Sequence, residues 1–133
     1  MKKILIFLFS VSIVFSMDLR LEKALKLSKN PVTQEKAAEK LLELTLEGNK
    51  RAMTELGRLY IYGKGVPKDC KKGTYLLFGA LLKTDSGEPE PEAMKELALM
   101  FKRGVCVKKD KEKYQKYLKK YFKMKSVKNK KTN

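Results

Sequence analysis

The sequence feature that most constrains the fold is an internal repeat in the middle of the chain. When the sequence is shifted by 41 residues, a segment that starts near residue 52 aligns with one that starts near residue 93. The aligned pairs are identical or similar in size and polarity: Ala52 and Ala93, Leu56 and Leu97, Leu59 and Met100, Tyr60 and Phe101, Gly63 and Gly104, Val66 and Val107, and Asp69 and Asp110. An upstream segment aligns after a shift of 36 residues, and the stretch 86–91 accounts for the difference. A period of 36 residues is typical of proteins built from stacked helical repeats.

Each repeat unit is predicted to be a helix, a Gly-rich loop and a second helix. The apolar residues between positions 52 and 60 recur at i, i+4, i+7 and i+8, which is the spacing of one helix face. Gly57 lies inside this helix, and we expect its missing Cβ to allow a neighbouring helix to approach closely. The glycines and proline of residues 63–67 predict a turn, and Asp69 is placed to cap the next helix. Because one hairpin cannot bury its own apolar face, the hairpins are expected to stack.

These patterns predict an all-α chain of about six helices. Asn30 and Pro31 separate the first two helices, and Thr33 is expected to cap the second. The predicted helices cover residues 18–28, 33–47, 50–62, 69–83, 91–102 and 110–123. Together they form one solenoid over residues 17–123, made of a partial unit (18–48) and two full units (49–84 and 91–123).

The N-terminus has the pattern of a signal peptide from Met1 to Ser16. Two lysines precede an apolar run over residues 4–15, and Val14 and Ser16 suit the −3 and −1 positions of a cleavage site. A retained membrane anchor is the alternative, but an apolar helix of this length spans only about 18 Å of a hydrocarbon core of roughly 30 Å. We therefore expect a periplasmic or secreted protein whose mature chain begins at Met17.

The counts of histidine and cysteine exclude several kinds of catalytic and metal site. The chain has no histidine, which excludes a Ser-His-Asp triad, a Cys-His pair and a histidine metal ligand. Two cysteines cannot supply the four ligands of a zinc site. The net charge is +16, and residues 107–133 alone hold 12 lysines against Asp110 and Glu112. These counts favour a binding protein, for which we expect no cofactor and no metal.

A set of residues in the first full unit follows a fixed order along the chain: Ala52, Leu56, Gly57, Tyr60, Gly63, Gly65, Val66, Asp69 and Lys72. The second unit repeats it in part, at Ala93, Leu97, Gly104, Val107, Asp110 and Lys113. This order resembles the pattern of the Sel1-like repeats, a family related to the tetratricopeptide repeats. The resemblance covers about residues 33–124. It departs from the family at Gly73, where alanine is usual, and at Ala98 and Cys106, where glycines are usual.

The resemblance implies a right-handed solenoid of antiparallel helix hairpins that acts as a protein–protein interaction or adaptor module. A distant branch, the Helicobacter cysteine-rich repeat proteins, includes proteins described as penicillin-binding or β-lactamase-like, so a hydrolase of that type is the alternative function. Thr45 and Met53 stand where that branch has paired cysteines, and the chain has no SxxK motif. A third interpretation is a basic protein that binds an anionic membrane or nucleic acid.

Cys70 and Cys106 lie in the loop regions of neighbouring units. A structural disulfide is one interpretation, and it would contribute roughly 4 kcal/mol in the chain-entropy model. The alternatives are two free thiols, or a redox or metal pair, although no CxxC motif supports the last. Export would place both cysteines in an oxidising compartment.

Candidate partner-binding residues lie on the first helix of each full unit, which lines the concave side in related hairpin repeats. They are Arg51, Thr54, Arg58, Ile61 and Tyr62 in one unit and Lys95, Leu99, Lys102 and Arg103 in the next. A surface that mixes these residue types suits a protein or peptide partner with acidic groups, because guanidinium groups chelate carboxylates. An ordinary solvated helix face is the alternative.

The last predicted helix combines an aromatic face with many lysines. The apolar spacing of Tyr114, Tyr117, Leu118, Tyr121 and Phe122 predicts a capping helix that packs on the preceding hairpin. The alternative, nucleic-acid binding, would use the tyrosines to stack on bases and the lysines to contact phosphates. Residues 124–133 are predicted to form a disordered basic tail that could contact an anionic membrane.

Overall fold

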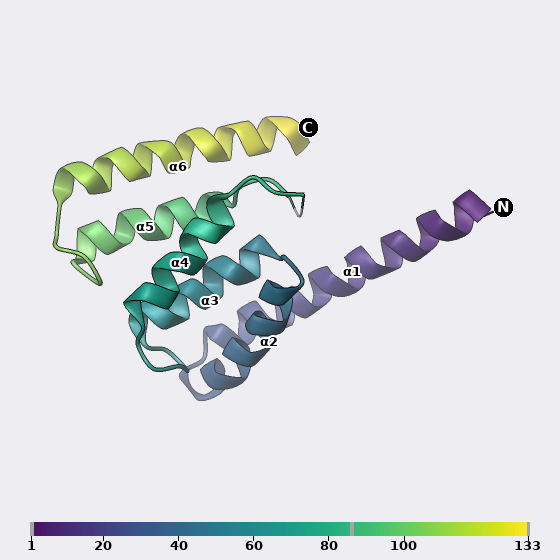
Figure 1. Ribbon diagram of the computed structural model, residues 1–133, viewed down its shortest axis with the longest axis horizontal. Coiled ribbons are helices and arrows are strands. Elements are labelled where there is room, and N and C mark those ends of the chain that lie inside the picture. Colours follow the sequence, from purple (N-terminus) through teal and green to yellow (C-terminus); the bar gives the residue numbers. More distant parts are fainter. Residues whose placement is uncertain (1, 86, 133) are drawn as a thin grey trace.

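The computed structural model describes residues 2–85 and 87–132 as a stack of helices (Figure 1). The helices are α1 (Lys2–Ser28), α2 (Gln34–Leu46), α3 (Lys50–Tyr62), α4 (Cys70–Leu81), α5 (Pro91–Arg103) and α6 (Lys111–Thr132), and a short 3-10 helix (Pro31–Thr33) joins α1 to α2. The described residues contain no strand. The prediction of an all-α chain with about six helices is confirmed.

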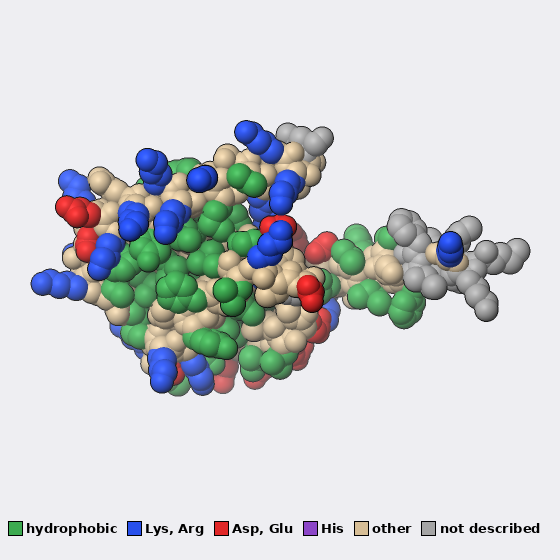
Figure 2. All heavy atoms as spheres, turned by 45° about the horizontal axis from the view of Figure 1, so that its top comes forward, with side chains coloured by type: hydrophobic (Ala, Val, Ile, Leu, Met, Phe, Trp, Pro, Cys, Tyr) green, Lys and Arg blue, Asp and Glu red, His purple; other side chains and the backbone are tan. Residues whose placement is uncertain are grey.

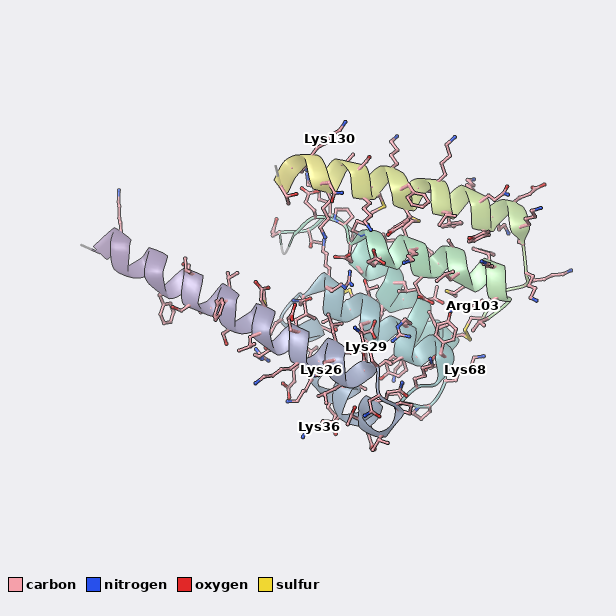
Figure 3. The ribbon with its side chains drawn as sticks, turned by 180° about the vertical axis from the view of Figure 1, so that it is seen from behind. Lys26, Lys29, Lys36, Lys68, Arg103 and Lys130 are labelled. Atoms are coloured by element: carbon pink, nitrogen blue, oxygen red, sulfur yellow. A yellow bond between two sulfur atoms is a disulfide. The ribbon has the colours of Figure 1, made fainter. Side chains whose placement is uncertain are left out.

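The helices pair in chain order into three hairpins. α1 packs on α2, α3 on α4 and α5 on α6, and each hairpin packs on the next. The first helices of the hairpins also contact one another, α1 with α3 and α3 with α5, and they lie side by side in Figure 3. Among the described residues, α2, α4 and α6 make no such contacts with one another. The first helices therefore line the inner side of the stack.

Two apolar clusters hold the hairpins together. The first joins α1, α2 and α3 through buried residues that include Ala24, Leu41, Leu44, Leu56 and Leu59. The second joins α3, α4 and α5 through Ile61, Leu77, Ala80, Ala93, Leu97 and Met100. Since each cluster draws on consecutive hairpins, the burial that stabilises the fold occurs between units as well as within them.

Two glycines allow α3 and α4 to cross at close range. A Cβ added to Gly57 would lie 3.0 Å from the carbonyl oxygen of Gly73. A Cβ added to Gly73 would lie 2.8 Å from the carbonyl oxygen of Gly57 and 2.6 Å from Cγ1 of Ile61. The expectation that Gly57 permits a close approach is confirmed, and the same contact explains why alanine does not fit at position 73.

The two Gly-rich loops have the same backbone geometry. Gly63 and Gly104 end α3 and α5 in the left-handed conformation, with φ values of 63° and 68°. The side chains of Asp69 and Asp110 each accept a hydrogen bond of 2.9 Å from the backbone N–H three residues later. The predicted cap at Asp69 is confirmed, and the repeat seen in the sequence is repeated in the structure of the loops.

Two predictions for the first hairpin are wrong. α1 begins at Lys2 rather than near residue 18, because residues 4–16 contain no Gly or Pro that would end the helix. The N-terminal part of α1 extends away from the stack (Figure 1). Thr33 does not cap α2: its hydroxyl instead donates a 2.8 Å hydrogen bond to the carbonyl oxygen of Leu27.

The predicted end of the last helix at residue 123 is also wrong. α6 continues to Thr132, through most of the segment predicted to be a disordered tail. The Nζ atom of Lys128 lies 3.2 Å from Glu90, and that of Lys131 lies 3.4 Å from Glu88. The connection between α4 and α5 therefore supplies acidic partners for the C-terminal turns of α6.

None of the helices formed by the described residues is both long enough and apolar enough to cross a membrane.

Candidate partner-binding face

Most of the predicted binding residues lie on one face of the stack, which we call the α1–α3–α5 face. The helices α1, α3 and α5 lie side by side along it (Figure 3). Its side chains are Ser28 of α1, Arg51, Glu55, Arg58 and Tyr62 of α3, and Lys95, Glu96, Leu99, Lys102 and Arg103 of α5. Two groups of hydrogen-bonded side chains run across it and join the three helices.

The first group centres on Glu55 and joins α1 to α3. Ser28 Oγ donates to Glu55 Oε1 at 2.6 Å, and Arg58 donates to both carboxylate oxygens, at 2.5 Å and 3.1 Å. Burial raises the pKa of Glu55, but the hydrogen bonds from Arg58 and Ser28 outweigh it, so the pKa lies below its ordinary value. Arg58, one of the predicted residues, is therefore already paired with a carboxylate of the same helix.

The second group centres on Tyr62 and joins α3 to α5. The Tyr62 hydroxyl donates to Glu96 Oε1 at 2.7 Å and accepts from Arg103 Nη1 at 2.7 Å. The guanidinium of Arg103 lies 5.5 Å from the centre of the Tyr62 ring. Burial raises the pKa of Tyr62, and the hydrogen bond to Glu96 raises it further. Tyr62 and Arg103, predicted from separate repeats, are thus brought into direct contact.

The remaining cations of the face are more exposed than the carboxylates they pair with. Arg51 lies 3.5 Å from Glu90, and the exposed fractions of the two side chains are 46% and 9%. Lys95 lies 3.6 Å from Glu92, with exposed fractions of 45% and 27%. An incoming carboxylate would therefore meet positive side chains before negative ones.

The remaining two predicted residues of α5 border α6 or solvent. Lys102 is exposed, and its Nζ lies 5.4 Å from the centre of the Tyr114 ring of α6. Leu99 is half-buried between the cations of α5. Together they add an apolar contact and a further positive charge to the face.

Thr54 and Ile61 do not belong to an exposed surface, and this part of the prediction is wrong. Thr54 is 6% exposed and donates its hydroxyl hydrogen to the carbonyl oxygen of Lys50 at 2.9 Å. Ile61 is fully buried in the cluster formed with Leu97 and Met100. Both lie on the edge of α3 that packs against the neighbouring helices, and helical spacing alone does not separate that edge from the solvent side.

The sequence prediction missed the two acidic residues that organise the face, Glu55 and Glu96. A signal for them is present, because the shift of 41 residues that aligns the two hairpins places Glu55 on Glu96. Acidic residues at equivalent, partly buried positions indicate a repeated structural role.

The two cysteines lie at disulfide distance. Cys70 at the start of α4 and Cys106 in the loop between α5 and α6 have sulfur atoms 2.07 Å and Cα atoms 5.4 Å apart. The candidate disulfide is thus supported, and it joins the second hairpin to the third beside the α3–α5 contact.

No protein-family model matches this chain, and a search of curated proteins finds no match either.

Proposed function

We propose that the chain is an exported Sel1-like repeat protein that acts as an interaction module and binds a protein partner on the α1–α3–α5 face. The observation that carries the proposal is the alignment of α1, α3 and α5, which brings Tyr62 and Arg103 together from two repeat units. Tyr and Arg are the side chains that most often dominate the energy of protein interfaces.

The partner is expected to present carboxylates and an apolar side chain. Arg51, Lys95, Lys102 and Arg103 all reach solvent, and Leu99 lies among the cations of α5. Glu96 is only 8% exposed and is hydrogen-bonded to Tyr62, so it is poorly placed to repel an acidic peptide. Charge-assisted hydrogen bonds to Arg and Lys would then fix the peptide's position.

Export is supported by two features of the chain. The N-terminal segment has the order of charged, apolar and small residues that typifies a signal peptide. The Cys70–Cys106 pair is compatible with an oxidising compartment outside the cytoplasm. We propose cleavage after Ser16, which leaves Met17 and Leu21 to pack against the first cluster.

Site-specific photo-crosslinking tests the proposal. A photoreactive amino acid at Leu99 should capture a discrete partner. The same group at Phe78 should not, because Phe78 is half-exposed on α4 and does not belong to the α1–α3–α5 face. The partner is then identified by mass spectrometry. Equal capture from both positions, or capture from Phe78 alone, would contradict the proposal.

A matched pair of variants shows whether positive charge contributes to the binding. Arg103→Gln should weaken binding of the captured partner about tenfold, the magnitude of a lost charge-assisted hydrogen bond. Lys71→Gln removes one positive charge from exposed α4 and should leave the affinity unchanged. Equal effects of the two variants would mean that only net charge matters.

A further inference from the structure

The C-terminal helix carries a row of lysines on the side that faces away from the stack. Lys116, Lys119 and Lys123 each follow an inward-facing tyrosine (Tyr114, Tyr117 and Tyr121) by two residues, which places them on the opposite side of α6. Lys130 lies two residues after Lys128, whose Nζ faces the stack because it pairs with Glu90. Lys130 is therefore also on the opposite side of α6. We call Lys116, Lys119, Lys123 and Lys130 the outer row, and Figure 2 shows the positive side chains that gather along α6.

The lysines of the outer row have no acidic partner, in contrast to three other lysines of α6. Lys113, Lys128 and Lys131 pair with Asp110, Glu90 and Glu88 at distances of 3.7, 3.2 and 3.4 Å. No carboxylate of the described residues forms an ion pair with a lysine of the outer row, and all four of these lysines are exposed. The outer row is therefore free to attract an anion from solution.

The tyrosines of α6 are not available for stacking on nucleic-acid bases. Tyr121 is 4% exposed and donates a 3.1 Å hydrogen bond to Glu92, and Tyr117 stacks on Phe101 with ring centres 5.5 Å apart. Tyr114 is half-buried, with Lys102 over its ring. Without exposed rings in a row, α6 lacks the stacking platform that single-stranded nucleic acid requires.

Apolar groups beside the outer row favour a lipid surface instead. Phe122 and Val127 are 59% and 48% exposed on α6. Val127 also lines a cavity of about 240 Å³ between α6 and the α4–α5 connection, together with Glu88, Pro89 and Met124, and Lys123 borders the same cavity. Exposed apolar side chains next to unpaired lysines match the boundary between acyl chains and phosphate headgroups.

We infer that the outer row of α6 docks the protein on a phospholipid bilayer that carries anionic headgroups. Lys116, Lys119, Lys123 and Lys130 lie against the headgroup phosphates, and Phe122 and Val127 contact the upper part of the acyl chains. The surface faces away from α5, so the protein can bind lipid while the α1–α3–α5 face holds a partner.

Vesicle co-flotation of the full chain tests the inference. Binding to vesicles of phosphatidylcholine with 30% phosphatidylglycerol should exceed binding to pure phosphatidylcholine, and the difference should shrink as salt rises. In the uncleaved chain, the exposed apolar part of α1 (Val11–Phe15) is expected to bind lipid without regard to charge, so the phosphatidylcholine vesicles measure its share. Equal binding to both vesicles would overturn the inference.

Two triple variants separate the outer row from net charge. Lys119→Gln/Lys123→Gln/Lys130→Gln should weaken binding to the anionic vesicles on the order of 100-fold, at about fivefold for each lysine. Lys26→Gln/Lys29→Gln/Lys36→Gln removes the same charge at the other end of the stack (Figure 3) and should change binding less than threefold. Circular dichroism confirms that both variants fold. Equal losses in the two variants would overturn the inference.

A tryptophan reporter locates the contact directly, because the chain contains no Trp. Phe122→Trp should shift its fluorescence to the blue when anionic vesicles are added, whereas Tyr75→Trp, on exposed α4, should not change. A shift confined to Tyr75→Trp would place the contact elsewhere and reject the inference. Tighter binding to single-stranded RNA than to anionic vesicles at the same salt would also reject it, in favour of nucleic acid.

Discussion

Cys106 combines two opposing effects on stability, which a pair of variants separates. Its φ of 63° lies in the left-handed region, close to the 71° of Gly65 at the equivalent place in the preceding loop. A residue with a Cβ loses about 1–2 kcal/mol in this conformation. The disulfide to Cys70 closes a span of 36 residues, which contributes roughly 4 kcal/mol through the reduced entropy of the unfolded chain.

The two double variants differ only in the residue at position 106. Cys70→Ser/Cys106→Ser removes the disulfide and keeps a Cβ in the left-handed conformation, so we expect the free energy of unfolding to fall by roughly 4 kcal/mol. Cys70→Ser/Cys106→Gly removes the disulfide and relieves the backbone, so the loss should be smaller by about 1 kcal/mol.

Urea unfolding followed by far-ultraviolet circular dichroism measures these differences. The oxidised wild type, the reduced wild type and both double variants are compared at one temperature, and the slopes show whether the unfolded states differ in compactness. If the glycine variant is no more stable than the serine variant, the left-handed backbone at position 106 depends on the disulfide, and the reasoning is refuted. A wild type whose stability does not change on reduction would refute the contribution of the disulfide.

Three further predictions concern the helix crossing, the Glu55 group and the C-terminal turns. Gly73→Ala should destabilise the protein by about 1–3 kcal/mol in thermal unfolding, because its Cβ would meet the α3 backbone, whereas Gly79→Ala meets only the flexible Met53 side chain and should be tolerated. The pKa of Glu55 lies below its ordinary value of 4.5, so its ionised form stabilises the fold above that pH and the contribution is lost as the pH falls through the folded-state pKa. Glu55→Gln should therefore flatten the acid side of the stability profile, and an unchanged profile would contradict the paired carboxylate. Deletion of residues 124–133 should lower the melting temperature, because α6 packs on residues 88–90; a disordered tail would leave it unchanged.

The fold could be predicted because the repeat constrains local structure and packing together. Helical spacing located the helices, and the glycines and Asp69 located the turns. The resemblance to hairpin repeats also implied that the first helices of the units would lie on one side, and they contact one another. Gly57 was informative because a glycine inside a helix needs a packing reason, and the reason proved to be the crossing of α3 and α4.

The remaining features depend on contacts between segments that are distant in sequence. Thr54 and Ile61 share the helical spacing of Arg58, but only the position of the neighbouring helices makes them buried. The last turns of α6 lack apolar periodicity. They form beside Glu88 and Glu90, which the sequence alone indicates only as part of a longer connection between two units. Helix propensity and spacing do not contain this information.

Hydrogen–deuterium exchange of the full chain, with and without the partner captured at Leu99, tests the central claim most directly. If the partner binds the α1–α3–α5 face, amide exchange should slow in the C-terminal turns of α3 and α5, around Tyr62 and Arg103, and stay unchanged in α4 around Phe78. Slower exchange in α2 and α4, with none in α3 and α5, would show that the partner binds the opposite side and would contradict the proposed function.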